Sequence, residues 1–265
     1  MIVIPGTAYA QARIQSRYGR RADAGVWLKL HKIHDLSSYL QTAQQMPLRH
    51  WVLGLGTNHS SHQIELTLRQ KYRSHVDEVA GWMPTDWRKS LQWVKRLVDL
   101  PVLQYLVDGG EPLTWIRSDP DISNFIADDP TQCLQAIRRA GNGVMVDKWQ
   151  QSGSILTGWL TQWNALRPES SLQNQGIARL QRLLLERKLH AQMQLQSKHQ
   201  EAMSPTEYEI INERLRLVYR RYAFLPAAVF AYLAMVALDI HRLRNDLMQR
   251  LYFQQSQEVA LRMPQ

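Results

Sequence analysis

Residues 61–82 read SHQIELTLRQKYRSHVDEVAGW, and this stretch decides the fold class of the 265-residue chain. Its apolar side chains recur at steps of four and three residues, at Ile64, Leu68, Tyr72, Val76 and Val79. Because an α-helix has about 3.6 residues per turn, these side chains share one face of a helix. The spacing therefore predicts a long amphipathic helix whose apolar stripe faces a protein core.

The same period recurs further along the chain. One set of apolar positions with this spacing comprises Trp87, Leu91, Val94, Leu97 and Val98, and another comprises Ile177, Leu180, Leu184 and Ala191. Each set predicts a helix, and Pro101 should stop or kink the first of them.

Helix boundaries carry their own signals. Asp129 and Pro130 predict an N-cap and a first helical residue, with a helix to about Ala140 that the glycines of Gly141–Gly143 should break. Ser204–Glu207 has the pattern of a capping box, with a proline at the first helical position.

Composition supports a helical protein. Glycine and proline together make up only 24 residues, and no segment shows the alternation of a strand. Apolar residues account for 45% of the chain and charged residues for 21%, which excludes wholesale disorder. The single cysteine, Cys133, excludes a disulfide framework. We predict an all-α fold of packed multi-helix bundles.

The net charge of +9 is unevenly distributed. Residues 1–110 carry +6, residues 111–171 carry −2 and residues 172–265 carry +5. These segments are candidate sub-bundles within a single helical assembly that spans residues 1–265. A positive surplus suits nucleic acid, anionic lipid or an acidic protein partner, and composition does not choose among them.

Membrane and targeting signals are weak. Met1–Gly6 is too short for a signal peptide, and arginines follow it closely. Residues Ala223–Leu238 carry no charge, but sixteen residues are fewer than the roughly 20 that a transmembrane helix needs. We therefore expect a buried helix, in a soluble protein or one that reaches a membrane only through partners.

No cofactor or metal site is expected. His31 with His34, and His59 with His62, offer two ligands each, where zinc sites need more. Gly54–Gly56 lacks both the third glycine of a dinucleotide site and the lysine of a phosphate loop.

Catalytic constellations are also missing. Cys133 has no histidine nearby in the sequence. Adjacent carboxylates on a helix point about 100° apart, so Asp77 and Glu78 are poorly arranged for shared acid–base work, and in the pair Asp128-Asp129 the second residue already serves as an N-cap. Nine tryptophans are unusual, and the helical spacing of Trp159 and Trp163 suits packing better than base stacking. We expect a protein that is not an enzyme.

Four stretches resemble a known family. They are Tyr9–Arg17, Asp35–Leu40, Val229–Ala234 and Asp239–Leu247. In this order they resemble the start, the second element and the closing helix of the C subunit, also called d, of V-type and archaeal A-type ATPases. Asp239 stands where members of that family commonly carry glutamate.

The resemblance implies a non-catalytic central-stalk subunit. Its helical bundles would form a funnel on the cytoplasmic face of the membrane, between the proteolipid ring and the central shaft, and would couple rotation to ion transport. The family fold has three bundles, and this shorter chain could hold a reduced version. The candidate partner-interface residues are Arg13, Arg17, Arg20, Arg21 and Arg244, although Arg13 and Arg244 could equally fix helix packing.

Two alternatives belong to other classes. A basic helical nucleic-acid-binding or regulatory protein would use the positive charge on phosphates, but no known nucleic-acid-binding motif supports it. A helical-bundle enzyme of the di-iron type would need paired Glu-x-x-His motifs, which the sequence lacks.

Overall fold

The computed structural model describes residues 7–127, 129–169, 174–194 and 204–262, with only the backbone described for 187–194 and 254–262. Met1–Gly6 and Asp128 lie outside the described residues, as does the side chain of Ala191. Helix makes up 77% of the chain and the described residues contain no strand, which confirms the predicted all-α class. The elements are α1 (Thr7–Tyr18), α2 (Ala24–His31), α3 (Leu36–Gln44), α4 (Arg49–Val52), α5 (Ser61–Trp82), α6 (Thr85–Trp93), η1 (Val94–Val98), α7 (Leu100–Val107), α8 (Thr114–Ser118), η2 (Ser123–Phe125), α9 (Pro130–Ile137), η3 (Arg138–Asn142), α10 (Gly143–Ser152), α11 (Ile155–Ala165), α12 (Ile177–Gln194), α13 (Pro205–Arg221) and α14 (Pro226–Arg262).

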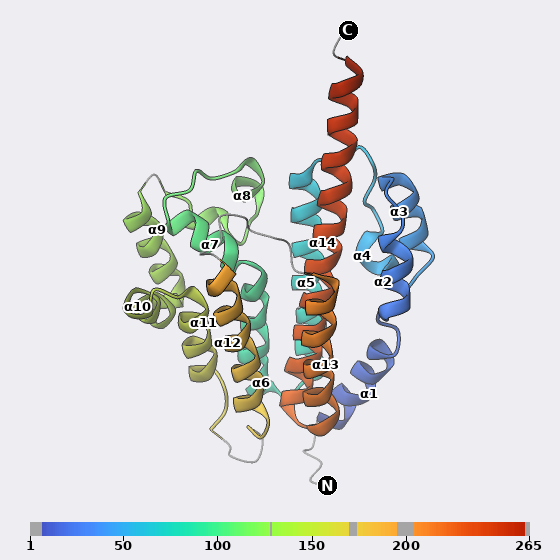
Figure 1. Cartoon of the computed structure of the whole chain (residues 1–265). Coiled ribbons are helices and arrows are strands. Elements are labelled where there is room, and N and C mark those ends of the chain that lie inside the picture. The colour runs from blue at the N-terminus through green and yellow to red at the C-terminus, as the bar shows by residue number, and fades with distance from the viewer. Residues whose placement is uncertain (1–6, 128, 170–173, 195–203, 263–265) are drawn as a thin grey trace.

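Two long helices, α5 and α14, form the spine of the molecule (Figure 1). Helix α14 packs against α13, α5, α1 and α3, so the end of the chain contacts its beginning. In Figure 1, α1–α4 lie on one side of this spine and α6–α12 on the other, and the end of α14 projects beyond its neighbours. The division into three sub-bundles remains a prediction.

Helix α14 is buried over its first half because that half is apolar all round. Every alanine, valine, leucine and aromatic residue from Ala227 to Leu233 is at most 3% exposed. Pro226–Phe253 is long and apolar enough to cross a membrane, but 72% of its most apolar window is buried inside the protein. A core helix passes the same test, and the burial agrees with the expected buried helix, although the helix begins at Pro226 and residues 223–225 form the turn before it.

The predicted helix signals are present. The capping box joins Ser204 and Glu207, and Asp129 caps α9 with Pro130 in the first turn. The predicted break falls at Gly141, whose φ of +83° interrupts the helical path between α9 and α10. The helix expected before Pro101 changes into the 3₁₀ helix η1, which ends at Val98. Pro101 then lies in the first turn of the next helix, α7.

Candidate functional site

Helix α5 carries a second stripe, made of charged rather than apolar side chains. Glu65, Arg69 and Arg73 follow one another at steps of four, so they lie on one face of the helix. All three are buried, with 5–6% of each residue exposed. Charged side chains are almost never buried unless they are paired, so this face must meet partners of opposite charge.

The partners come from two connections later in the chain. Asp99 precedes α7 and lies 3.1 Å from Arg69 and 2.6 Å from Arg73. Asp119 follows α8, is fully buried, and accepts two hydrogen bonds from Arg73, at 2.8 and 3.0 Å. The charged face of α5 therefore fixes the segment 99–119 onto the spine.

Further ion pairs surround this centre and balance its charge. Arg69 pairs with Glu65 at 2.8 Å, and Arg244 of α14 pairs with the other oxygen of Glu65. The outermost pairs are Arg73 with Asp121 at 3.0 Å and Arg96 with Asp99 at 3.6 Å. The network thus contains four arginines and four carboxylates. We call these eight residues the buried charge network after its buried centre, although the side chains of Arg96, Arg244 and Asp121 at its edge are 26%, 43% and 51% exposed. The eight are Glu65, Arg69, Arg73, Arg96, Asp99, Asp119, Asp121 and Arg244.

Burial and charge compete within the network. Burial works to raise the pKa of Glu65, but the guanidinium groups of Arg69 and Arg244 outweigh it and hold that pKa below its usual range. Burial raises the pKa of Asp99 against the opposing effect of Arg73 and Arg69. For Arg73, burial is outweighed by the adjacent carboxylates, which raise the pKa of the guanidinium. Arg73 is therefore the cation on which the network depends.

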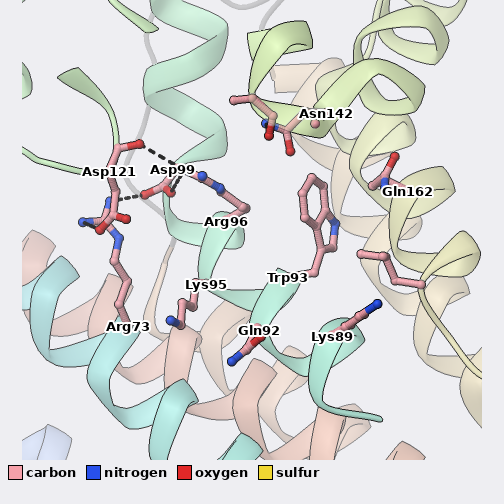
Figure 2. Close-up of a pocket in the computed structure, with 13 residues that line it drawn as sticks. Arg73, Lys89, Gln92, Trp93, Lys95, Arg96, Asp99, Asp121, Asn142 and Gln162 are labelled. Carbon is pink, nitrogen blue, oxygen red and sulfur yellow. Dashed lines mark hydrogen bonds and ion pairs between the residues drawn. The ribbon is translucent and has the colours of Figure 1, made fainter. Parts of the chain in front are cut away.

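A cavity of about 400 Å³ opens beside this network (Figure 2). It lies between α6–η1 on one side and the η3 turn with α11 on the other. Figure 2 shows Trp93 in the middle of the labelled side chains, with Arg96 on one side and Gln162 on the other. We call it the polar pocket, and its lining residues are Arg73, Lys89, Gln92, Trp93, Lys95, Arg96, Asp99, Asp121, Ala140, Gly141, Asn142, Gln162 and Leu166.

The five arginines predicted to contact partners fall into two groups. Arg21 and Arg244 are engaged inside the protein. Arg21 pairs with Asp239 at 2.8 Å and hydrogen-bonds to Asn212, and Arg244 is part of the buried charge network. Both join helices that are far apart in the sequence, which is a packing role.

The other three lie on the outer face of α1 and just beyond its end. Arg13 and Arg17 both lie over the ring of Trp82, at 5.5 and 5.3 Å from its centroid, and Arg17 also pairs with Glu78 at 2.5 Å. Arg20 is exposed, and its side chain makes no ion pair or hydrogen bond within the part of the chain that the structure describes. Arg13, Trp82, Arg17 and Arg20 are hereafter called the α1 arginine face.

The two histidine pairs, His31 with His34 and His59 with His62, lie outside the lining of the polar pocket. Within residues 7–127, 129–169, 174–194 and 204–262, no three His, Cys, Asp or Glu side chains are grouped so that they could hold a metal ion. His59 instead accepts a hydrogen bond from the amide of Gly56, which closes the turn before α5. Cys133 is buried, and its thiol donates a weak hydrogen bond to the carbonyl oxygen of Ala127 at 3.7 Å.

Sequence reasoning missed the buried charge network, although one signal was present. The acid–base–base series Glu65, Arg69 and Arg73 has the spacing of i, i+4 pairs, but such pairs occur mostly on exposed helix faces. The series is buried because Asp99 and Asp119 lie opposite it. The tertiary fold brings these two residues there, and the local sequence of α5 does not indicate it.

A buried histidine on α5 makes stability depend on pH. His75 is 4% exposed, lies 3.0 Å from the hydroxyl of Tyr232 and packs edge-on against Trp51. Its Nδ1 has no hydrogen-bond partner among the described residues. Burial, aided by the positive charge of Arg17, lowers the pKa of His75 to about 4.

We therefore expect unfolding free energy to fall by about 2 kcal/mol between pH 7 and pH 5. A folded-state pKa below the unfolded value of 6.5 means that only the unfolded chain binds a proton in this window, so acid favours unfolding. Urea titrations at several pH values measure the slope. His75→Gln should flatten the slope of unfolding free energy against pH. His50→Gln replaces an exposed histidine and should leave most of that slope in place. An unchanged slope in His75→Gln would show that His75 titrates normally.

Comparison of the chain with protein-family models, with curated proteins and with solved structures found no match in any of the three.

Proposed function

We propose that this chain is a non-catalytic central-stalk subunit of a rotary V-type or A-type ATPase, which couples a rotating shaft to the proteolipid ring on the cytoplasmic face of a membrane. One observation carries the proposal. Two of the four stretches that resemble that family lie within α14, and the other two, in α1 and at α3, belong to helices that pack against α14 although they are about 200 residues away in the sequence.

The contacts between these stretches are specific. Arg21, just after the first stretch, pairs with Asp239 at 2.8 Å, so the acidic residue of the closing helix has a defined partner. Tyr39, in the second stretch, donates a hydrogen bond to Asp246 at 3.0 Å.

The turn before α14 is held by the first helix. Phe224 has a φ of +66°, which a residue other than glycine rarely adopts. Its carbonyl accepts a hydrogen bond from Thr7 at 2.9 Å, and its amide donates one to Gln11 at 3.4 Å. Helix α1 thus holds the turn that leads into α14, and a subunit that transmits torque needs such fixed contacts between its helices.

The α1 arginine face is the best candidate for a partner contact on this unit. Tryptophan and arginine are enriched where binding energy concentrates, and Arg13 and Arg17 are already ordered by stacking on Trp82. An ordered side chain loses less entropy when a partner binds. Because the α1 arginine face carries three positive charges, the partner surface should be acidic.

Ion pumping by membrane vesicles tests the coupling role. In vesicles from native cells that lack this chain, we expect ATP-driven ion uptake to be lost while the catalytic head still hydrolyses ATP, because the torque path is broken. Restoring the chain should restore uptake. Normal uptake without the chain would contradict the proposal.

A matched pair of charge reversals tests the contact face. Arg20→Glu should weaken retention of the chain on the membrane about tenfold, because it places a like charge against an acidic partner. Arg139→Glu reverses another exposed arginine, in η3 on the other side of the spine, and should have no effect. Salt washes of membranes carrying each variant measure retention, and equal retention would remove Arg20 from the interface.

The nucleic-acid alternative has less support. Many of the arginines that would contact phosphates are engaged in ion pairs inside the protein, including Arg21, Arg69 and Arg73. Phosphate binding releases counterions and weakens steeply with salt. Salt-sensitive binding to RNA or DNA would revive the alternative.

A further inference from the structure

The polar pocket has the size of a small-molecule site. Its volume of about 400 Å³ falls within the range of about 300–1,000 Å³ that ligand pockets occupy. Walls from α6–η1 and from α11 enclose it on two sides, and residues of the η3 turn complete it. Neither helix packing nor the proposed partner contact on the α1 arginine face occupies this cavity.

Its lining carries a positive surplus. Four cations, Arg73, Lys89, Lys95 and Arg96, face two carboxylates, Asp99 and Asp121. Both carboxylates are already engaged, Asp99 by three arginines and Asp121 by Arg73. The lining residues alone therefore have a net charge of +2. Two carboxylates outside the lining offset part of it, because Arg73 also pairs with Asp119 and Lys95 with Asp77.

The free cation is Lys89. It is exposed on α6 and makes no ion pair or hydrogen bond within the described part of the chain. Lys95 pairs with Asp77, which lies outside the lining, and Arg96 is 3.6 Å from Asp99 and donates to the carbonyl of Asp121 at 3.1 Å. Lys89 can therefore bind an anion without breaking an existing contact.

Three buried polar atoms of the lining residues lack hydrogen-bond partners among the described residues. They are the Nε of Arg73, the Oδ2 of Asp99 and the Oε1 of Gln162. Buried polar groups normally are hydrogen-bonded, so unsatisfied ones call for water or a ligand. The two oxygens can accept a hydrogen bond, and the Nε of Arg73 can donate one.

Trp93 gives the pocket a fixed aromatic wall. Its indole Nε1 donates to the carbonyl of Trp159 at 3.1 Å, which sets the orientation of the ring. Figure 2 shows the ring beside Arg96 and above Lys89. Aromatic rings held in this way provide surfaces for planar ligand groups.

We infer that the polar pocket binds a small phosphate-bearing anion, with its phosphates between Lys89, Lys95 and Arg96. Two sources share this chemistry: an inorganic oligophosphate, and a nucleotide whose base lies on Trp93. The site is independent of the stalk proposal, because neither the α1 arginine face nor the four stretches that resemble the ATPase subunit contribute to its lining.

Calorimetric titration of the full chain tests the site, with inorganic pyrophosphate and ATP as separate probes. Binding of either should weaken about tenfold in Lys89→Gln, because one charge-assisted hydrogen bond is lost. Lys29→Gln, at an exposed lysine of α2, is the matched control and should bind as the unaltered chain does. Circular dichroism and thermal melting check that both variants fold.

A third variant separates the two sources. If the anion is a nucleotide, Trp93→Leu should weaken ATP and leave pyrophosphate unchanged. If phosphate alone is recognised, the variant should bind both probes as before. Either result supports the site. It is overturned if neither probe binds at millimolar concentration, or if Lys89→Gln and Lys29→Gln bind equally.

Discussion

Arg73→Met is expected to destabilise the protein by about 3–5 kcal/mol, because it leaves the buried carboxylate of Asp119 without its partner and takes one of three arginines from Asp99. Asp119 is fully buried, and Arg73 is its only ion-pair partner among the described residues. Arg73 donates two hydrogen bonds to it. Asp99 would lose its shortest contact, at 2.6 Å. Methionine fills part of the volume but neutralises neither charge.

Chemical denaturation at neutral pH measures this loss. Arg20→Met makes the same substitution at an exposed arginine without an ion pair in the described structure, and should change stability by no more than about 0.5 kcal/mol. Adding Asp119→Asn to Arg73→Met should recover part of the loss, because one uncompensated charge is removed. A loss below about 1 kcal/mol for Arg73→Met would mean that water reaches the network.

Gly158→Ala is expected to cost about 3 kcal/mol, because α10 and α11 pack too closely for a methyl group. A Cβ atom at Gly158 would overlap the carbonyl oxygen of Met145 and lie 3.1 Å from its carbonyl carbon. Both are backbone atoms, so a side-chain rotation cannot relieve the contact. The two helices would have to separate along a tightly packed hairpin.

Gly81→Ala supplies the matched control. Gly81 is also helical, in the last turn of α5, but a Cβ there meets nothing within 4 Å. Alanine should therefore stabilise this position, by up to about 1 kcal/mol, through its better helix propensity. Thermal melting of the two variants measures the contrast, and equal melting temperatures would contradict the close packing at Gly158.

Local signals predicted the helices well, because period and capping act over a few residues. The apolar series from Ile64 to Val79 and the capping box at Ser204 both depend on neighbours within a turn or two. The glycine at position 141 likewise broke the helix for a local reason, its positive φ.

Partners across the chain could not be predicted in this way. Arg21, one of the predicted partner-interface residues, pairs with Asp239, 218 residues away. Nothing in the spacing of either residue indicates that the turn after α1 meets α14. The spacing of Arg73, Asp99 and Asp119 likewise does not indicate that they meet. The sequence therefore predicts an arginine-rich helical protein but not the buried charge network.

Affinity purification of the tagged full chain from solubilised membranes of its native cells tests the stalk assignment most directly. Mass spectrometry of the purified material should identify the catalytic head, the central shaft and the proteolipid ring of a rotary ATPase, in fixed proportion to the chain. Arg20→Glu should reduce that recovery and Arg139→Glu should not. Recovery of the chain without any rotary ATPase subunit would contradict the assignment.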